Sequence, residues 1–502
     1  MSFFDQSASA KSAAPMPAST SEIYIGKGKT PQKLLLKYAN RHGLIAGATG
    51  TGKTLTLQGL AEGFSAAGVP VFIADVKGDL SGLSQAGIPK DPLVKRAAEI
   101  GYDYQYFACP TMFWDIFGKS GTPVRVSVSE MGPMLLAQLL QLNDVQEGVL
   151  NIAFAVADAQ NMLLLDFDDL RSMLTHISDN SKEIGAQYGN VSAASVGTIQ
   201  RGLLTLEQQG AKNLFGEPAL DINDLIALAP NGQGIVNILA AETLMSSPKL
   251  YASFMLWLLA ELFEDLPEMG DLDKPKLVFF FDEAHLLFND APKSLVEKIE
   301  QLVRLIRSKG VGVYFITQNP ADIPASVLGQ LSNRVQHALR AFTPQDQKGV
   351  KAAADTFRPN PAFKTAEVIT TLGVGEALVS TLDDKGTPTI VERTLIKPPS
   401  SLVGPISPAI RQQIIAASRL RGKYEQTVNR ESAHEMLSKR AQEVPQQIQQ
   451  TYAPRAAQVA APRGRQPESL AMVVTKSVVR AAGSQIGRQI VRGLMSSLLK
   501  GR

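Results

Sequence analysis

The stretch GATGTGKT, residues 47–54, follows a short apolar run and precedes the helix-like run LTLQGLAEGF. Its spacing, a glycine and four residues followed by Gly-Lys-Thr, fits the P-loop pattern. Glycines let the backbone turn tightly so that successive N–H groups converge on a phosphate, and a helix beginning near Gly52 adds its positive dipole end. A chance turn is the alternative, but strand, loop and helix occur here in the order that phosphate binding needs. The stretch therefore predicts a nucleotide-binding site in an α/β protein.

The pattern assigns a role to each residue of the loop. We expect ATP to be bound by Gly47, Ala48, Thr49, Gly50, Thr51, Gly52, Lys53 and Thr54. Lys53 would reach the β- and γ-phosphates, and the hydroxyl of Thr54 would take a position on Mg²⁺.

Outward from the loop, short β-rich apolar runs alternate with helical patterns, which is typical of a parallel sheet with helices on both faces. Predicted strands cover residues 43–47, 69–75, 234–239, 276–282 and 312–317, and further strand-like segments cover residues 335–342, 376–382 and 389–395. Helical patterns dominate from about residue 80 to 231, which predicts a helical insertion. The predicted fold class is α/β, a RecA-like (ASCE) P-loop NTPase with this insertion and a C-terminal amphipathic helix.

Composition shifts divide the rest of the chain. We predict a flexible leader at residues 1–20, an ATPase domain at 21–397, and a Pro/Gln-rich linker region with partial helix at 398–467, beginning near KPPSSLVGPISP. Residues 468–502 place apolar side chains every four residues opposite Lys and Arg, which predicts a basic amphipathic helix. It would pack on its own ATPase domain or a neighbour's, or bind DNA or an acidic partner.

Overall composition excludes several classes of protein. Apolar residues make up 44% of the chain, enough for a full core, and 50 Lys and Arg against 47 Asp and Glu neither demand nor exclude nucleic acid. The single cysteine, Cys109, rules out a disulfide framework and fits a reducing compartment. The longest apolar run, LYASFMLWLLAELF, is too short for a bilayer and carries Glu261. We expect a cytoplasmic protein without membrane insertion.

A second signal is KLVFFFDEAH, in which apolar β-formers deliver two acids to the carboxyl end of a buried strand. Asp282 would hold Mg²⁺ through water, and Glu283 would orient or deprotonate the attacking water. An acidic helix N-terminus after a core strand is the alternative, which the P-loop makes less attractive. We do not assign His285 a role, because other motifs of DEAH-box helicases are not visible.

The strand GVGVYFITQNP ends in Gln318, whose amide would sense the γ-phosphate, unless it is an ordinary residue of the turn before Pro320. The helix before this strand carries Arg304 and Arg307 in its last turn. They cap the helix dipole, or one of them is an arginine finger that reaches a neighbouring subunit. The segment DVKGDL, which follows the second strand, is interpreted as a turn rather than as a ligand contact.

Taken in order, GATGTGKT, FIADVKGDL, FFFDEAH and RSKGVGVYFITQNPADIP resemble the HerA/FtsK branch of P-loop ATPases, and within it the HerA-like helicase C-terminal family of the YjgR type. The resemblance covers about residues 23–397. It implies a hexameric ring that uses ATP to pull double-stranded DNA through a pore. It also implies that Lys53 and Thr54 contact phosphate and Mg²⁺, that Asp282 and Glu283 act on metal and water, and that Gln318 senses phosphate. Arg307 is then the more plausible trans finger.

One departure limits the analogy. HerA has a β-barrel ahead of the P-loop that docks a nuclease, whereas only 46 residues precede Gly47 here, so a nuclease partner does not carry over. Two hypotheses stay open: an ATP-driven ring motor acting on DNA as a translocase or helicase, and an ATP-gated regulatory or scaffold protein that does not translocate. Glu283 and Gln318 favour the motor, because a passive switch needs only tight binding.

Overall fold

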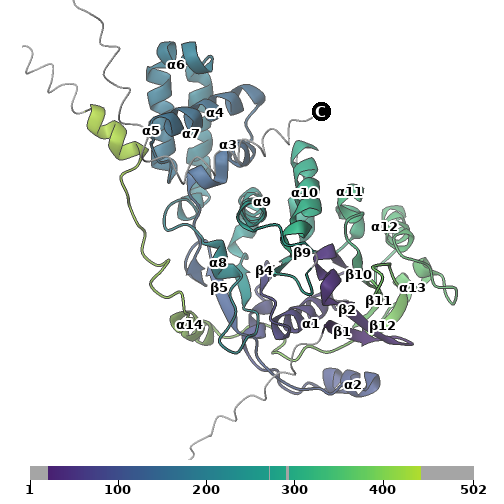
Figure 1. Ribbon diagram of the computed structural model, residues 1–502. Coiled ribbons are helices and arrows are strands. Elements are labelled where there is room, and N and C mark those ends of the chain that lie inside the picture. Colours follow the sequence, from purple (N-terminus) through teal and green to yellow (C-terminus); the bar gives the residue numbers. More distant parts are fainter. Residues whose placement is uncertain (1–20, 271, 290–292, 442–502) are drawn as a thin grey trace, which may run out of the picture. The chain divides into compact units, whose positions relative to one another are not determined.

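The computed structural model of the chain describes residues 21–270, 272–289 and 293–441. These residues form a twelve-stranded mixed sheet (Figure 1). In order across the sheet, the strands are β2 (Pro31–Leu35), β1 (Glu22–Lys27), β12 (Glu392–Ile396), β11 (Glu376–Ser380), β10 (Asn333–His337), β3 (Gly43–Ala46), β9 (Val311–Thr317), β8 (Leu277–Phe281), β4 (Val71–Asp75), β7 (Val236–Ala240), β5 (Thr111–Asp115) and β6 (Thr122–Pro123). The strands from β10 to β6 are parallel, and the other four pair antiparallel.

The centre of the sheet explains the position of the site. β9 lies between β3 and β8, pairing Ala46 with Thr317 on one side and Phe281 with Phe315 on the other. All three strands run in the same direction, so their carboxyl ends share one edge of the sheet, where ligands of such folds bind. β9 is thus an extra strand between the P-loop strand β3 and the acidic strand β8, which fits the predicted ASCE class.

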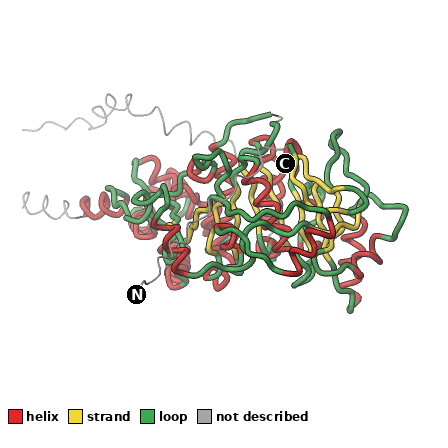
Figure 2. Tube along the Cα trace, turned by 90° about the horizontal axis from the view of Figure 1, so that it is seen from below, coloured by secondary structure: helices red, strands yellow, loops and turns green. Residues whose placement is uncertain are grey.

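Helices cover both faces of this sheet, because alternate side chains of a strand point to opposite sides. Phe279 and Phe281 belong to the core under α9 (Pro248–Asp265) and α10 (Lys293–Ile306). Val278 and Phe280 belong to the core against α1 (Lys53–Ala66). In Figure 1, α9 and α10 lie above the strands and α1 below them, and the strands lie side by side as the yellow segments of Figure 2.

The helical insertion lies at the upper left of Figure 1. Its helices are α3 (Val128–Leu139), α4 (Asp144–Ala159), α5 (Phe167–Asp179), α6 (Ser181–Tyr188) and α7 (Ala193–Gln208). The segment predicted to be helical, residues 80–231, also holds β5 and β6, which extend the sheet beyond β7. Their alternation was hidden in the sequence because the short run TMFWD is buried on both faces.

The remaining helices are short and flank these elements. They are α2 (Asp91–Ile100), α8 (Ile222–Leu225), α11 (Ala325–Leu328), α12 (Pro344–Asp355), α13 (Thr365–Thr371) and α14 (Pro408–Ala416). All of these elements belong to one compact unit that ends at Leu437. None of the helices in the described part of the chain combines the length and apolar character needed to cross a bilayer. The predicted leader and the basic C-terminal helix lie outside the described residues.

Two sequence interpretations at the ends of the ATPase domain are corrected by the structure. β1 and β2, at residues 22–35, were not predicted, although they form one border of the sheet. The stretch KPPSSLVGPISP was predicted to be a linker, yet residues 397–401 are buried. The reason is Glu62 of α1, whose buried carboxylate accepts hydrogen bonds from the backbone N–H of Ser400 (2.9 Å) and Ser401 (2.8 Å).

Candidate functional site

The P-loop connects β3 to α1 at the carboxyl edge of the sheet. Gly47, Gly50 and Gly52 have φ values of 153°, 78° and 117°, a region that favours glycine. A Cβ on Gly47 would lie 2.5 Å from the Cβ of His337, and one on Gly52 would lie 3.3 Å from Gly375. At Gly50 a Cβ would meet nothing within 4 Å. Close packing therefore supports the base of the loop, while its tip faces open space.

Lys53, the first residue of α1, folds back onto the loop. Its Nζ donates hydrogen bonds to the carbonyl oxygens of Gly47 (2.5 Å) and Ala48 (3.0 Å), and the residue is 7% exposed. Burial, together with the positive charge of Lys77, lowers the pKa of this ammonium group. An anionic partner such as a phosphate stabilises a buried ammonium group. Binding phosphate is the role that the sequence predicts for Lys53.

His337 at the end of β10 supports the loop from beneath, and the sequence analysis missed it. Its Nδ1 lies 2.9 Å from the carbonyl oxygen of Glu376, which can only accept, so Nδ1 carries the proton. Its Nε2 must then accept the hydrogen bond of the Thr56 hydroxyl, 2.8 Å away. Burial lowers the pKa of His337 to about 4, so the ring is neutral at pH 7. Only the pairing of β10 with β3 could have revealed this position.

Asp282 follows the last residue of β8 and is 7% exposed. Its Oδ1 accepts a hydrogen bond from the backbone N–H of Glu283 at 3.0 Å. Burial raises the pKa of Asp282 to about 7; the charge of Lys77 lowers it, and those of Glu283 and Asp75 raise it further. A buried carboxylate with so few donors favours a cation, as expected of a residue that holds Mg²⁺.

Glu283 adopts left-handed backbone angles, φ 49° and ψ 49°, which are strained for a residue with a side chain. Lys77 Nζ lies 2.6 Å from its Oε1, and His285 Nδ1 lies 3.3 Å from its Oε2. Burial would raise the pKa of Glu283, but the hydrogen bond and charge of Lys77, together with His285 and Gln318, outweigh burial and the pKa is lowered. His285, to which we assigned no role, is thus a neighbour of the candidate base.

Gln318 follows the last residue of β9 and links the two halves of the site. Its Nε2 lies 3.4 Å from both carboxylate oxygens of Glu283, and its Oε1 accepts a hydrogen bond from the Thr49 hydroxyl at 3.3 Å. One amide therefore connects the P-loop to the candidate base. This is the position from which an amide would respond to the presence of a γ-phosphate.

Arg307 lies elsewhere. It occupies a 3₁₀ turn (Arg307–Lys309) after α10, just before β9 begins. Its carbonyl oxygen accepts a hydrogen bond from Asn40, and its charge acts on His42, which precedes β3. These neighbours lie at the amino ends of the strands, whereas the P-loop lies at their carboxyl ends. The structure thus does not bring Arg307 to the P-loop of its own chain, and Arg304 is exposed on α10.

The segment DVKGDL, after β4, forms the predicted turn. Asp75 accepts hydrogen bonds from the backbone N–H of Gly78 (2.8 Å) and of Leu80 (3.1 Å), and Gly78 has a φ of 74°. Burial raises the pKa of Asp75 to about 6. The turn also presents Lys77 to Glu283, a contact that the sequence pattern did not predict.

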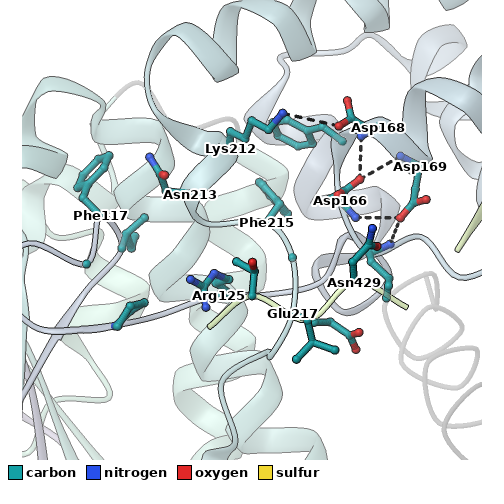
Figure 3. Close-up of a pocket in the computed structure, with 18 residues that line it drawn as sticks. Phe117, Arg125, Asp166, Asp168, Asp169, Lys212, Asn213, Phe215, Glu217 and Asn429 are labelled. Atoms are coloured by element: carbon teal, nitrogen blue, oxygen red, sulfur yellow. Dashed lines mark hydrogen bonds and ion pairs between the residues drawn. The ribbon is translucent and has the colours of Figure 1, made fainter. Parts of the chain in front are cut away.

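A cavity of about 440 Å³ lies away from this edge, between the insertion and the C-terminal segment near Asn429 (Figure 3). Three acids that line it have structural partners. Asp166 and Asp169 accept hydrogen bonds from backbone N–H groups at the start of α5, and the Asp168 carboxylate lies 3.6 Å from the Lys212 ammonium group. Arg125 donates to the carbonyl oxygen of Tyr424 at 2.7 Å. The cavity shares no lining residue with the P-loop edge.

The residues present at the P-loop edge fit a nucleoside triphosphate with Mg²⁺. The open tip at Gly50 leaves room beside the loop N–H groups, and Lys53 and Thr54 stand at the start of α1. Among the described residues, no group of three or more His, Cys, Asp or Glu could hold a metal ion. Mg²⁺ suits such a site, because it binds through one or two protein ligands together with phosphate oxygens.

Comparison with known proteins gives a consistent picture. The family model described as Helicase HerA-like C-terminal matches residues 20–502. DNA import protein CedB of Sulfolobus acidocaldarius is 24% identical over 374 residues, which cover 73% of this chain and 55% of CedB. The DNA double-strand break repair helicase HerA of the same organism is 21% identical over 386 residues, covering 72% of this chain and 67% of HerA. The chain thus spans about half the length of CedB.

Solved structures agree at the level of the fold. The bacterial conjugative coupling protein TrwB in its unbound monoclinic form has a TM-score of 0.51 at 14% identity, covering 77% of this chain and 91% of that chain. TrwB in complex with the GTP analogue GDPNP has a TM-score of 0.50 at 14% identity, covering 77% and 92%. The predicted α/β P-loop NTPase class is confirmed.

Proposed function

This chain belongs to the Helicase HerA-like C-terminal family, and on that premise we propose that it is an ATP-hydrolysing ring motor that acts on DNA as a translocase or helicase. The DNA part of the proposal is supported by the names of the relatives, a DNA import protein and a DNA repair helicase. The proposed assembly is a hexamer, working in the cytoplasm. No nuclease partner is included in the proposal.

The observation that carries the proposal is the contact of Gln318 with both Thr49 and Glu283. A protein that only binds nucleotide needs the P-loop, but not a carboxylate joined to it through an amide. In this arrangement, a change at the phosphate end is transmitted directly to the group that activates water.

We assign the roles as follows. The loop N–H groups and Lys53 bind the phosphates, and Thr54 and Asp282 hold Mg²⁺. Bound Mg²⁺ supplies positive charge that neutralises the phosphate oxygens. Glu283 accepts a proton from, or orients, the attacking water, and Gln318 aligns Glu283 with the loop. Arg307, at the opposite edge of the sheet, acts on the site of a neighbouring subunit.

The alternative is an ATP-gated regulatory or scaffold protein that does not translocate DNA. It is favoured by one contact, the ion pair of Glu283 with Lys77, because a carboxylate bound in this way is not free to activate water. The two functions differ in whether the bound nucleotide is turned over.

The test is the steady-state rate of ATP hydrolysis by the full chain with and without double-stranded DNA, alongside native mass measurement in ATP. A motor hydrolyses ATP, is stimulated by DNA and has the mass of a closed ring. A protein that binds ATP and oligomerises but shows no hydrolysis on any DNA tested would establish the scaffold instead.

A further inference from the structure

We propose that Lys77 is a positioning residue that holds Glu283 in a resting state, and that Glu283 becomes available to activate water when Lys77 leaves this carboxylate for a phosphate. The inference rests on the proposed ATPase function and adds a device that controls the same site. It assigns a task to a residue that sequence reasoning placed in a simple turn.

The first observation is that Lys77 is the dominant partner of Glu283. The Nζ–Oε1 distance is 2.6 Å, whereas His285 and Gln318 lie 3.3 and 3.4 Å from the carboxylate. A carboxylate held by an ammonium group at this distance is a weaker proton acceptor, because its charge and a lone pair are already engaged. In this state Glu283 is therefore not ready to activate water.

The second observation is that the anchor of Lys77 is rigid. Asp75 binds the backbone N–H of Gly78 and of Leu80 across the turn, and the carboxylate of Glu242 occupies the space where a Gly78 side chain would lie. β4 is paired with β8, joining Ala74 to Phe281, so the turn and Glu283 start from adjacent strands. The backbone is thus fixed, and only the side chain of Lys77 is free to change partner.

The third observation is the difference in exposure within the pair. The Lys77 side chain is 42% exposed, whereas that of Glu283 is 8% exposed. A ligand from solvent therefore reaches the cation more easily than the carboxylate. The charge of Lys77 also acts on Lys53, the lysine assigned to the phosphates of the P-loop. A phosphate is the anion that two such ammonium groups attract. Its source is either the nucleotide or the backbone of DNA.

The test compares Lys77→Met, which keeps the stem and removes the charge, with Lys77→Arg, which keeps a cation. Without DNA, we expect Lys77→Met to raise kcat about three- to ten-fold, as expected for the loss of a half-buried ion pair that restrains the base. We expect Lys77→Arg to restore most of the restraint. Lys385→Met, an exposed lysine on a distant loop, is the matched control and should leave kcat unchanged.

Two further readouts identify the phosphate. If DNA supplies it, Lys77→Met loses most of its stimulation by double-stranded DNA while KM for ATP stays near wild type. If the nucleotide supplies it, KM rises several-fold and DNA stimulation is retained. Binding of a fluorescent ATP analogue and the melting temperature are measured in parallel, so that a misfolded variant is recognised and replaced by Lys77→Gln.

An unchanged or lower kcat in a folded Lys77→Met protein, with active wild type, overturns the resting-state role. A wild-type protein that binds ATP without hydrolysing it contradicts the proposed function instead, so the two failures are distinguishable.

Discussion

At the scale of single residues, the site depends on side chains brought together from the ends of separate strands. Thr49 follows β3, Gln318 follows β9 and Glu283 follows β8, and they form one chain of polar contacts. The sequence analysis named all three, Thr49 from the P-loop spacing and the other two because they follow apolar runs. It could not predict Lys77 as a partner or His337 as a support, because these depend on which strands are neighbours.

Substitution of Lys53 and Glu283 separates binding from chemistry. Lys53→Ala should abolish nucleotide binding, since the buried ammonium group is the cation nearest the loop. Glu283→Gln should keep binding and lower turnover by about a hundred-fold or more, because the amide cannot accept the proton of water. Isothermal titration with an ATP analogue and phosphate release measure the two effects. Equal loss of binding in both variants would contradict this division of roles.

His337 gives the protein a pH-dependent stability. Its pKa of about 4 lies below the value of about 6.5 in the unfolded chain, so only the unfolded state binds its proton between these values. Its contribution is fully present above pH 6.5 and is lost as the pH falls toward 4. At pH 5 the loss is about 2 kcal/mol.

We compare wild type with His337→Gln in urea unfolding at pH 7.5 and pH 5. The difference in unfolding free energy between the two proteins should shrink by about 2 kcal/mol at the lower pH. Thr56→Val is the control, because it removes the hydrogen-bond partner of Nε2 and keeps the imidazole ring. Its unfolding free energy should fall between pH 7.5 and pH 5 by nearly as much as that of wild type. Parallel pH dependence of wild type and His337→Gln would show that the ring is not held neutral.

At the scale of elements, the segment at residues 397–406 is a strap fastened to the helix that follows the P-loop. Glu62 accepts from Ser400 and Ser401, and Gln58 donates to the Ser401 hydroxyl at 2.7 Å and to the Leu402 carbonyl at 3.0 Å. Gln58 and Glu62 stand four residues apart on α1, a polar stripe that sequence patterns assign to solvent. The strap explains why that stripe is buried.

Glu62→Gln tests the strap. The amide nitrogen of glutamine is a donor, so it cannot accept the hydrogen bonds that the backbone N–H groups of the strap give to Glu62. We therefore expect a loss of about 2–4 kcal/mol in unfolding free energy. Glu99→Gln, an exposed acid on α2, is the control and should change stability by less than about 0.5 kcal/mol. Hydrogen exchange measurements should show faster exchange of the backbone amides of residues 400–402. Full protection there in Glu62→Gln would mean that the carboxylate does not fasten the strap.

At the scale of elements, some strands could be predicted from the sequence and others could not. The five core strands were predicted within about two residues, since long apolar runs between turn residues identify buried strands. β1, β2, β5 and β6, toward the two borders of the sheet, were missed. The run TMFWD of β5 is buried almost throughout and shows no alternation, and β6 has only two residues. The strap was mistaken for a linker, because Pro/Ser composition does not reveal a buried acceptor such as Glu62.

At the scale of the whole molecule, the two edges of the sheet have different tasks in the proposed ring. The P-loop, Glu283 and Gln318 share the carboxyl edge, and Arg307 lies near the amino ends of β3 and β9. An arginine finger at the amino edge does not reach the P-loop of its own chain, so in the proposed ring it would act on the site of a neighbouring subunit. Arginine fingers raise phosphoryl-transfer rates by about a thousand-fold or more.

Arg307→Ala subunits should therefore be inactive alone, with turnover lowered about a thousand-fold. Mixed with Lys53→Ala subunits, they should regain part of the activity, because one type of interface in the mixed ring keeps both the finger and the loop. ATP hydrolysis across mixing ratios, in rings shown by native mass to contain both subunits, measures this. Arg304→Ala is the control. If no mixing ratio restores activity, Arg307 only caps the C-terminal end of its helix and does not act on a neighbouring subunit.

The insertion leaves the sheet after β6 and returns at β7, two strands separated only by β5 at one border. Both of its ends therefore join the domain on the same side, away from the row β3, β9 and β8 that carries the loop and the acids. A change in the length or content of the insertion alters the border without displacing that row. Gene fusion or recombination that exchanges this bundle for another therefore leaves the strands of the candidate nucleotide site unchanged.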